Sequence, residues 1–109
     1  MSNRLDALKN MVAQNPNDSF SRYGLAMEYA RSGDLEQAVE EYRALLAANP
    51  NYPAAYFHGG QALEKLGRRE EARALYLQGI ETTTRLGDLH TRSEIQAALD
   101  LLVSVPPDF

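Results

Sequence analysis

A 34-residue internal repeat constrains the fold of this 109-residue chain more than any other feature. The residues that coincide after a shift of 34 are Asn15-Pro16 with Asn49-Pro50, Gly33 with Gly67, Glu36 with Glu70, Ala38 with Ala72, and Tyr42 with Tyr76. These residue types begin, end and pack helices, and they recur at one period. The chain is therefore predicted to stack like units against one another.

The composition favours helices over strands. Alanine and leucine occur 15 times each, whereas valine and isoleucine together occur six times. Helices favour alanine and leucine, while strands favour β-branched residues. The length is also that of one domain, since domains usually have about 100–200 residues. We therefore expect a single all-α domain over residues 1–105.

Local signals predict six helices and several of their ends. Gly33 suits the left-handed conformation that ends a helix, and Asp34 with Gln37 forms a capping-box pattern at the start of the next. Pro53 suits a first helical turn, and Asp88 suits an N-cap. The expected helices cover about residues 5–14, 18–32, 35–48, 53–66, 69–84 and 88–105, with the end of the fifth left open between residues 84 and 86.

Two runs of residues resemble the tetratricopeptide repeat family. That family's pattern places an aromatic, Leu-Gly, Tyr, Ala, a second aromatic and Pro at set spacings within 34 residues. The first run is Arg22, Leu25-Ala26, Tyr29, Ala38, Tyr42 and Pro50, and the second is Tyr56, Gly59-Gly60, Leu63, Ala72, Tyr76 and Thr84. The first departs from the pattern at Arg22, and the second departs at Gly59 and Thr84.

The resemblance implies an α-solenoid of antiparallel helix pairs. Full units would span residues 19–52 and 53–86, preceded by an N-terminal half-unit helix and followed by a capping helix at 88–105 and a frayed tail at 106–109. Small residues would let the helices of each unit cross closely, and the two repeated tyrosines would fill the space between units. The small residues are Ala26 and Ala38 in the first unit, and Gly60 and Ala72 in the second.

The residues of each first helix that are not used against the second helix form one stripe. Spacings of three and four place these residues on a common helical face, and the resemblance implies that this concave surface binds a protein or peptide partner. The predicted groove residues are Phe20, Tyr23, Met27, Arg31, Phe57, His58, Gln61 and Lys65. Tyr23, Met27 and His58 stand where some family members carry the Lys and Asn side chains that clamp a chaperone's terminal carboxylate, so no such clamp is expected. The alternative is that the capping helix fills this groove.

The residue inventory disfavours catalysis and cofactor binding. The chain has no cysteine and two histidines, His58 and His90, and it lacks a glycine-rich phosphate loop. His90 and Glu94 could supply half of a metal site, but no third ligand lies near them in the sequence. We therefore expect no enzyme, no metal and no cofactor.

Charge and hydropathy restrict the partners further. The formal net charge is −4, without a basic half, which disfavours nucleic acid. The longest apolar run is four residues, and the N-terminus lacks the apolar core of a signal peptide, which disfavours a membrane and favours the cytoplasm. Two further hypotheses remain: a homodimer through Ala97, Leu101 and Val105, and a non-catalytic accessory subunit of an enzyme complex.

Overall fold

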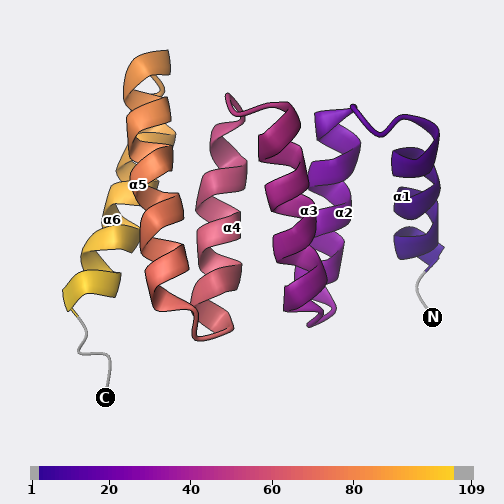
Figure 1. The fold of residues 1–109 in the computed structure, drawn as a ribbon, viewed down its shortest axis with the longest axis horizontal. Helices are drawn as coiled ribbons and strands as arrows, with labels where there is room; N and C mark the ends of the chain where they lie inside the picture. Colours follow the sequence, from indigo (N-terminus) through magenta and orange to yellow (C-terminus); the bar gives the residue numbers. More distant parts are fainter. Residues whose placement is uncertain (1–2, 105–109) are drawn as a thin grey trace.

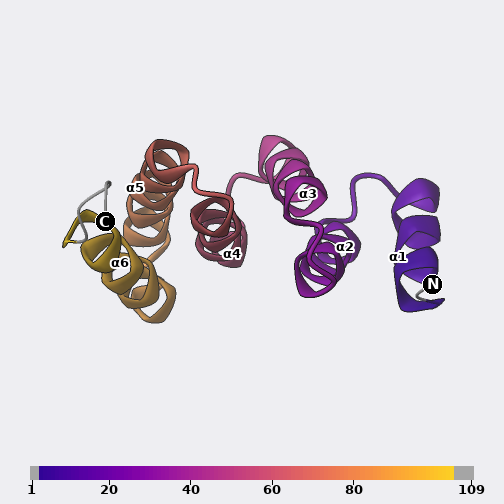
Figure 2. The same ribbon diagram turned by 90° about the horizontal axis from the view of Figure 1, so that it is seen from below.

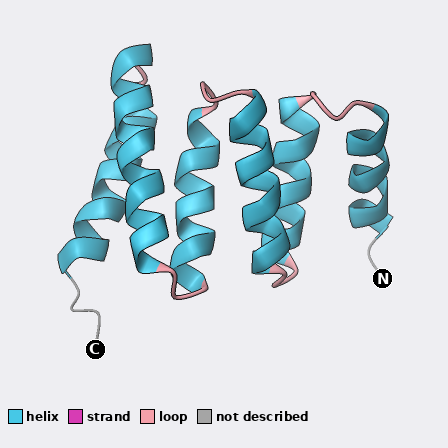
Figure 3. Cartoon of the chain, viewed as in Figure 1, coloured by secondary structure: helices cyan, strands magenta, loops and turns pink. Residues whose placement is uncertain are grey.

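Six helices make up most of the chain in the computed structural model, which describes residues 3–104. The helices are α1 (Asn3–Gln14), α2 (Ser19–Arg31), α3 (Leu35–Ala48), α4 (Pro53–Lys65), α5 (Arg69–Leu86) and α6 (Leu89–Ser104). No strand occurs among the described residues (Figure 3). The prediction of an all-α chain with six helices is confirmed.

The helices form a two-layered stack about 40 Å long. The loops that join them alternate between the two ends of the helices (Figure 1), so that successive helices run in opposite directions. Viewed along the helices, α2, α4 and α6 lie in one layer, and α3 and α5 lie in the other (Figure 2). The pairs α2–α3 and α4–α5 pack closely, and α6 packs against both α5 and α4. This arrangement is an α-solenoid.

The small residues predicted between the two helices of each unit are buried. Ala26, Ala38 and Ala72 have no exposed surface. At Gly60, a Cβ atom would lie only 2.1 Å from Cε1 of Tyr76, so the buried tyrosine ring occupies the place of a side chain. The burial of Ala38 and Ala72 predicted from the 34-residue register is confirmed. Tyr42 also lies against Gly59 of the next unit, as a residue between units should.

Each unit makes an equivalent hydrogen bond, although the residue type that donates it differs. The hydroxyl of Tyr56 donates to the carbonyl oxygen of Pro50 at 2.7 Å. One repeat earlier, Nη2 of Arg22 donates to the carbonyl oxygen of Pro16 at 3.1 Å. Arg22 also pairs with Glu41 of α3 at 2.9 Å. The departure from the family pattern at Arg22 therefore keeps the link between the first helix of the unit and the loop before it.

Several helix ends differ from the expected ones. Asp34 makes no side-chain hydrogen bond to the first turn of α3, so the predicted capping box is wrong. Asp88 does act as a cap, because its carboxylate accepts from the backbone N–H of Thr91 at 3.1 Å. The fifth helix continues to Leu86, since Thr84 replaces the proline that would have stopped it, and Gly87 then ends it in a left-handed conformation. Val105 and residues 106–109 lie outside the described residues.

Candidate functional site

A groove of about 530 Å³ opens between α1, α2 and α4, with α3 contributing to its floor. The residues that line it are Arg4, Phe20, Tyr23, Gly24, Met27, Glu28, Ala30, Arg31, Leu35, Tyr42, His58, Gln61, Ala62 and Lys65. No residue of α6 is among them. The capping helix therefore does not fill this groove.

Seven of the eight predicted groove residues line this groove: Phe20, Tyr23, Met27, Arg31, His58, Gln61 and Lys65. The eighth, Phe57, does not. Its half-buried ring packs edge-on against His58, with the ring centroids 5.1 Å apart and the planes at 74°. Phe57 thus supports the wall formed by His58 instead of facing the groove. Whether the seven residues bind anything remains a prediction.

The apolar part of the groove is an aromatic cluster centred on Tyr23. Its ring centroid lies 5.3 Å from that of Tyr52, 5.9 Å from His58 and 6.3 Å from Tyr42. The hydroxyl of Tyr42 donates to Sδ of Met27 at 2.9 Å, which holds the methionine at the groove floor. Phe20, by contrast, is 73% exposed. The cluster is a fixed apolar surface with one protruding ring.

The charged part of the groove is built around a single buried carboxylate. Glu28 on α2 is 4% exposed. Its carboxylate oxygens lie 3.0 Å from Nε of Arg4 on α1 and 2.7 Å from Nη2 of Arg31, one turn further along α2. The side chains of the two arginines are 72% and 70% exposed. Lys65 lines the same groove from the last turn of α4 and makes no ion pair with any residue that the structure describes.

Burial shifts the pKa values of Tyr23 and His58 in the aromatic cluster. It raises the pKa of Tyr23 above its usual value, and the nearby Tyr52 and Glu94 raise it further. It lowers the pKa of His58, although the carboxylate of Glu94 opposes that change. Both groups are therefore neutral near pH 7, and this part of the groove carries no charge of its own.

The capping helix extends the same concave surface beyond the groove. Glu94 of α6 acts electrostatically on both Tyr23 and His58, so this side of α6 faces α2 and α4. Leu101 follows two turns later on the same side of the helix, and it is 69% exposed. Ala97, also exposed, lies between them. The residues proposed for a dimer interface therefore belong to the concave face, apart from Val105, which lies outside the described residues.

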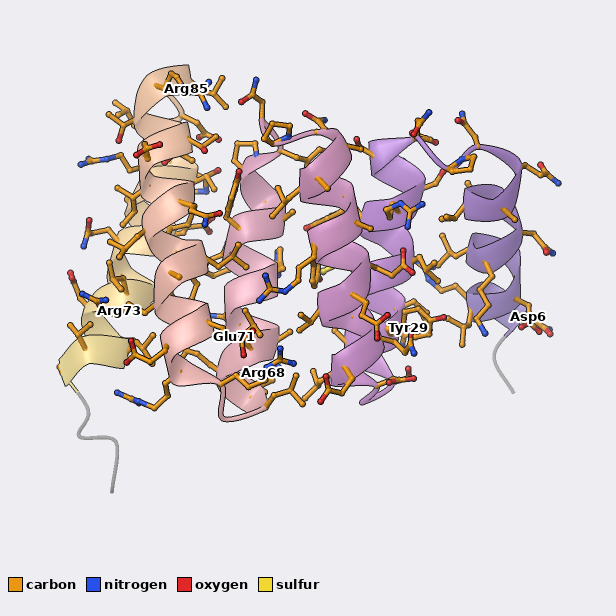
Figure 4. All side chains as sticks on the ribbon, viewed as in Figure 1. Asp6, Tyr29, Arg68, Glu71, Arg73 and Arg85 are labelled. Carbon is orange, nitrogen blue, oxygen red and sulfur yellow. The ribbon has the colours of Figure 1, made fainter. Side chains whose placement is uncertain are left out.

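Sequence reasoning missed Arg4 and Glu28. The spacing of Glu28 and Arg31, three residues apart on a helix, was a usable signal for an ion pair. It gave no sign that the carboxylate would be buried. The contact between Arg4 and Glu28 joins two helices, so only the packing of α1 against α2 reveals it. Tyr29, which faces α1 in Figure 4, contributes to that packing: Nζ of Lys9 lies 5.9 Å from its ring centroid.

The histidine and carboxylate of α6 form an exposed pair. Nε2 of His90 lies 3.7 Å from Oε2 of Glu94, and the His90 side chain is 85% exposed. Among residues 3–104, no cluster of three or more histidine, aspartate or glutamate side chains could hold a metal ion. Over the same range, no helix has the length and apolar character needed to cross a membrane.

The sequence pattern of the tetratricopeptide repeat family matches residues 23–84, which is more than half of the chain. The chain belongs to the tetratricopeptide repeat family. Its two complete repeats are the pairs α2–α3 and α4–α5, while α1 and α6 flank them. The groove lies on the face formed by the first helices of the repeats, where the predicted stripe was placed.

Proteins from other organisms resemble the chain in sequence and in structure. The photosystem I assembly protein Ycf3 of Rippkaea orientalis is 35% identical over 89 residues, which cover 74% of this chain and 50% of that protein. The chain thus spans about half the length of this relative. A tetratricopeptide repeat domain protein of Salinibacter ruber superposes with a TM-score of 0.79 at 32% identity, covering 84% of this chain and 93% of that one.

A more distant structure shares the fold alone. The type III secretion chaperone SycD of Yersinia enterocolitica, solved in complex with a peptide of the translocator YopD, superposes with a TM-score of 0.78 at 19% identity. The match covers 90% of this chain and 76% of that one.

Proposed function

We propose that this protein binds a segment of a partner protein in the groove between α1, α2 and α4. The observation that carries the proposal is the exposed ring of Phe20 beside the fixed aromatic cluster of Tyr23, in a groove that α6 leaves open. Aromatic residues are enriched at the centres of protein interfaces, where a few side chains contribute most of the binding energy. The SycD structure, which contains a translocator peptide, supports the proposal by showing that this fold can hold one.

The proposed role is binding and not catalysis. The groove holds one histidine, and its one carboxylate is paired with two arginines. General acid–base work requires a group within reach of a substrate proton and free to exchange it. Glu28 does not meet that requirement, because its carboxylate is buried and already paired with two guanidinium groups. The partner could equally be an enzyme for which this protein is an accessory subunit.

Truncation of the groove tests the proposal. The partner is first captured from native lysate on the full chain and identified, and its affinity is then measured by calorimetry. Phe20→Ala and Tyr23→Ala should each weaken binding at least tenfold, about 1.4 kcal/mol, because central aromatic anchors commonly contribute more than this. Glu40→Ala, an exposed position on α3, is the matched control and should leave the affinity unchanged. Loss of binding in Glu40→Ala alone would place the partner on the outer face.

Self-association is a second candidate, favoured by the exposed leucine at position 101. Two further apolar residues of α6, Leu89 and Val103, are 72% and 58% exposed. Sedimentation equilibrium at several concentrations distinguishes the two functions. A dimer that dissociates in Leu101→Lys would favour self-association, whereas a monomer at every concentration would rule it out.

A further inference from the structure

We infer that the partner segment in this groove carries carboxylate side chains, which bind at the end formed by Arg4, Arg31 and Lys65. The inference rests on the proposed function and specifies the chemistry of the partner. Apolar residues of the same segment would contact Phe20, Tyr23 and Met27.

The charge of the groove is opposite to that of the whole protein. Three cations and one carboxylate line the groove, so its net charge is +2 with His58 neutral. The chain as a whole has a net charge of −4. Complementary potentials of this kind guide a partner to one site and exclude partners of the wrong sign. A nucleic acid is also an anion, but it would meet the repulsion of the remaining acidic surface.

The ion pairs of the groove are unbalanced, unlike those on the other face. On α3 and α5, the two guanidinium groups of Arg43 and Arg68 share the two carboxylates of Glu36 and Glu71. Arg68 and Glu71 lie together near the start of α5 in Figure 4. In the groove, two guanidinium groups share the one carboxylate of Glu28, and Lys65 has none. The groove therefore has positive charge left to bind an acid, whereas the network of Arg43, Arg68, Glu36 and Glu71 is balanced.

Glu28 also prepares the two arginines to bind a carboxylate. Arg31 contacts Glu28 through Nη2 alone, and Arg4 contacts it through Nε, although a guanidinium carries five N–H donors. The remaining donors belong to side chains that are about 70% exposed, within reach of a ligand. Because the buried carboxylate already restricts both long side chains, less conformational entropy remains to be lost on binding.

A purely apolar partner would fit this groove less well. It would cover the cations without replacing the water that solvates them, and an unpaired charge is costly to desolvate. A carboxylate replaces that water with charge-assisted hydrogen bonds, which are roughly twice as strong as neutral ones. The cations thus select for an acidic segment as well as attracting one.

Peptide selection tests the inference without a known partner. Phage-displayed random 12-residue peptides are selected on the immobilised full chain, and the most enriched peptides are synthesised and titrated by fluorescence anisotropy. We expect Asp or Glu to be enriched next to aromatic or aliphatic residues. The double variant Arg31→Gln/Lys65→Gln should bind these peptides at least tenfold more weakly. The matched control, Arg73→Gln/Arg92→Gln, removes the same charge from exposed positions outside the groove and should change the affinity less than twofold.

The outcomes separate a failure of the inferred acidic ligand from a failure of the proposed groove function. Selected peptides without acidic residues that lose affinity in Phe20→Ala but not in Arg31→Gln/Lys65→Gln would overturn the inference and leave the groove function standing. An equal loss in the control double variant would also overturn it, since the attraction would then come from overall charge. Failure to select any peptide above background would count against both. Circular dichroism melts of each variant establish that it folds.

Discussion

Gly60→Ala is expected to destabilise the protein, although alanine is the better helix former. A Cβ atom at this position would lie 2.1 Å from Cε1 and 2.6 Å from both Cδ1 and Cζ of Tyr76. Ordinary contacts begin at about 3.4 Å, so the ring would have to move by more than 1 Å. Tyr76 is fully buried, and its hydroxyl is hydrogen-bonded to Glu64, which leaves the ring little room to yield.

Two opposing terms set the size of the effect. Overpacking a close-packed core costs up to about 3 kcal/mol. Replacing glycine by alanine inside a helix stabilises the folded protein by about 1 kcal/mol. The net loss is therefore about 2 kcal/mol, which corresponds to roughly 10 °C in melting temperature for a domain of this size. Urea titration followed by circular dichroism should show a midpoint lower by about 1 M, with an unchanged slope.

Two variants make the result decisive. Gly24→Ala is the control, because its new Cβ atom meets only a flexible methyl group of Leu8 at 3.2 Å. It should leave the stability unchanged or raise it by up to about 1 kcal/mol. In a Tyr76→Leu background, which removes the ring, Gly60→Ala should no longer be destabilising. A Gly60→Ala variant as stable as the native chain would refute the proposed contact between glycine and ring.

Three further predictions concern the core, the buried carboxylate and pH. Ala72→Leu, at a fully buried crossing, should lower the free energy of unfolding by about 1–3 kcal/mol in urea titrations, and an unchanged midpoint would contradict the 34-residue register. Arg4→Ala and Arg31→Ala should each cost less than about 1 kcal/mol, because Glu28 keeps one partner. The double variant should cost about 3 kcal/mol, since the buried charge then has none, and additive single effects would refute this role. Burial raises the pKa of Tyr42 above its usual value of 10, so the stability that Tyr42 contributes should be constant below pH 10 and fall above it, where the tyrosine of the unfolded chain ionises first. Melts between about pH 8 and 11 measure this fall, and it should be smaller in Tyr42→Phe.

The repeat register was predictable because it depends on local chemistry. Glycine at positions 33 and 67 and proline at position 53 act within one turn of helix, so their effects can be recognised in the sequence alone. The 34-residue spacing then paired Ala26 with Ala38 and Gly60 with Ala72, and the structure buries all four. Asp34 stands at the predicted N-cap position, but the predicted capping box was wrong, because a side-chain hydrogen bond depends on a rotamer that the pattern does not specify.

The residue pattern alone was enough to predict the helices, their order and the stripe that faces the concave side, since each follows from periods of 3.6 and 34 residues. Which residues of the stripe share a groove depended instead on how the helices pack together. The packing of α4 left Phe57 out of the groove lining, and the approach of α1 brought Arg4 to Glu28. These outcomes depend on the angles and distances between helices, which arise from many packed side chains at once. A local pattern fixes which face of a helix is apolar, but the neighbouring helices fix what that face meets.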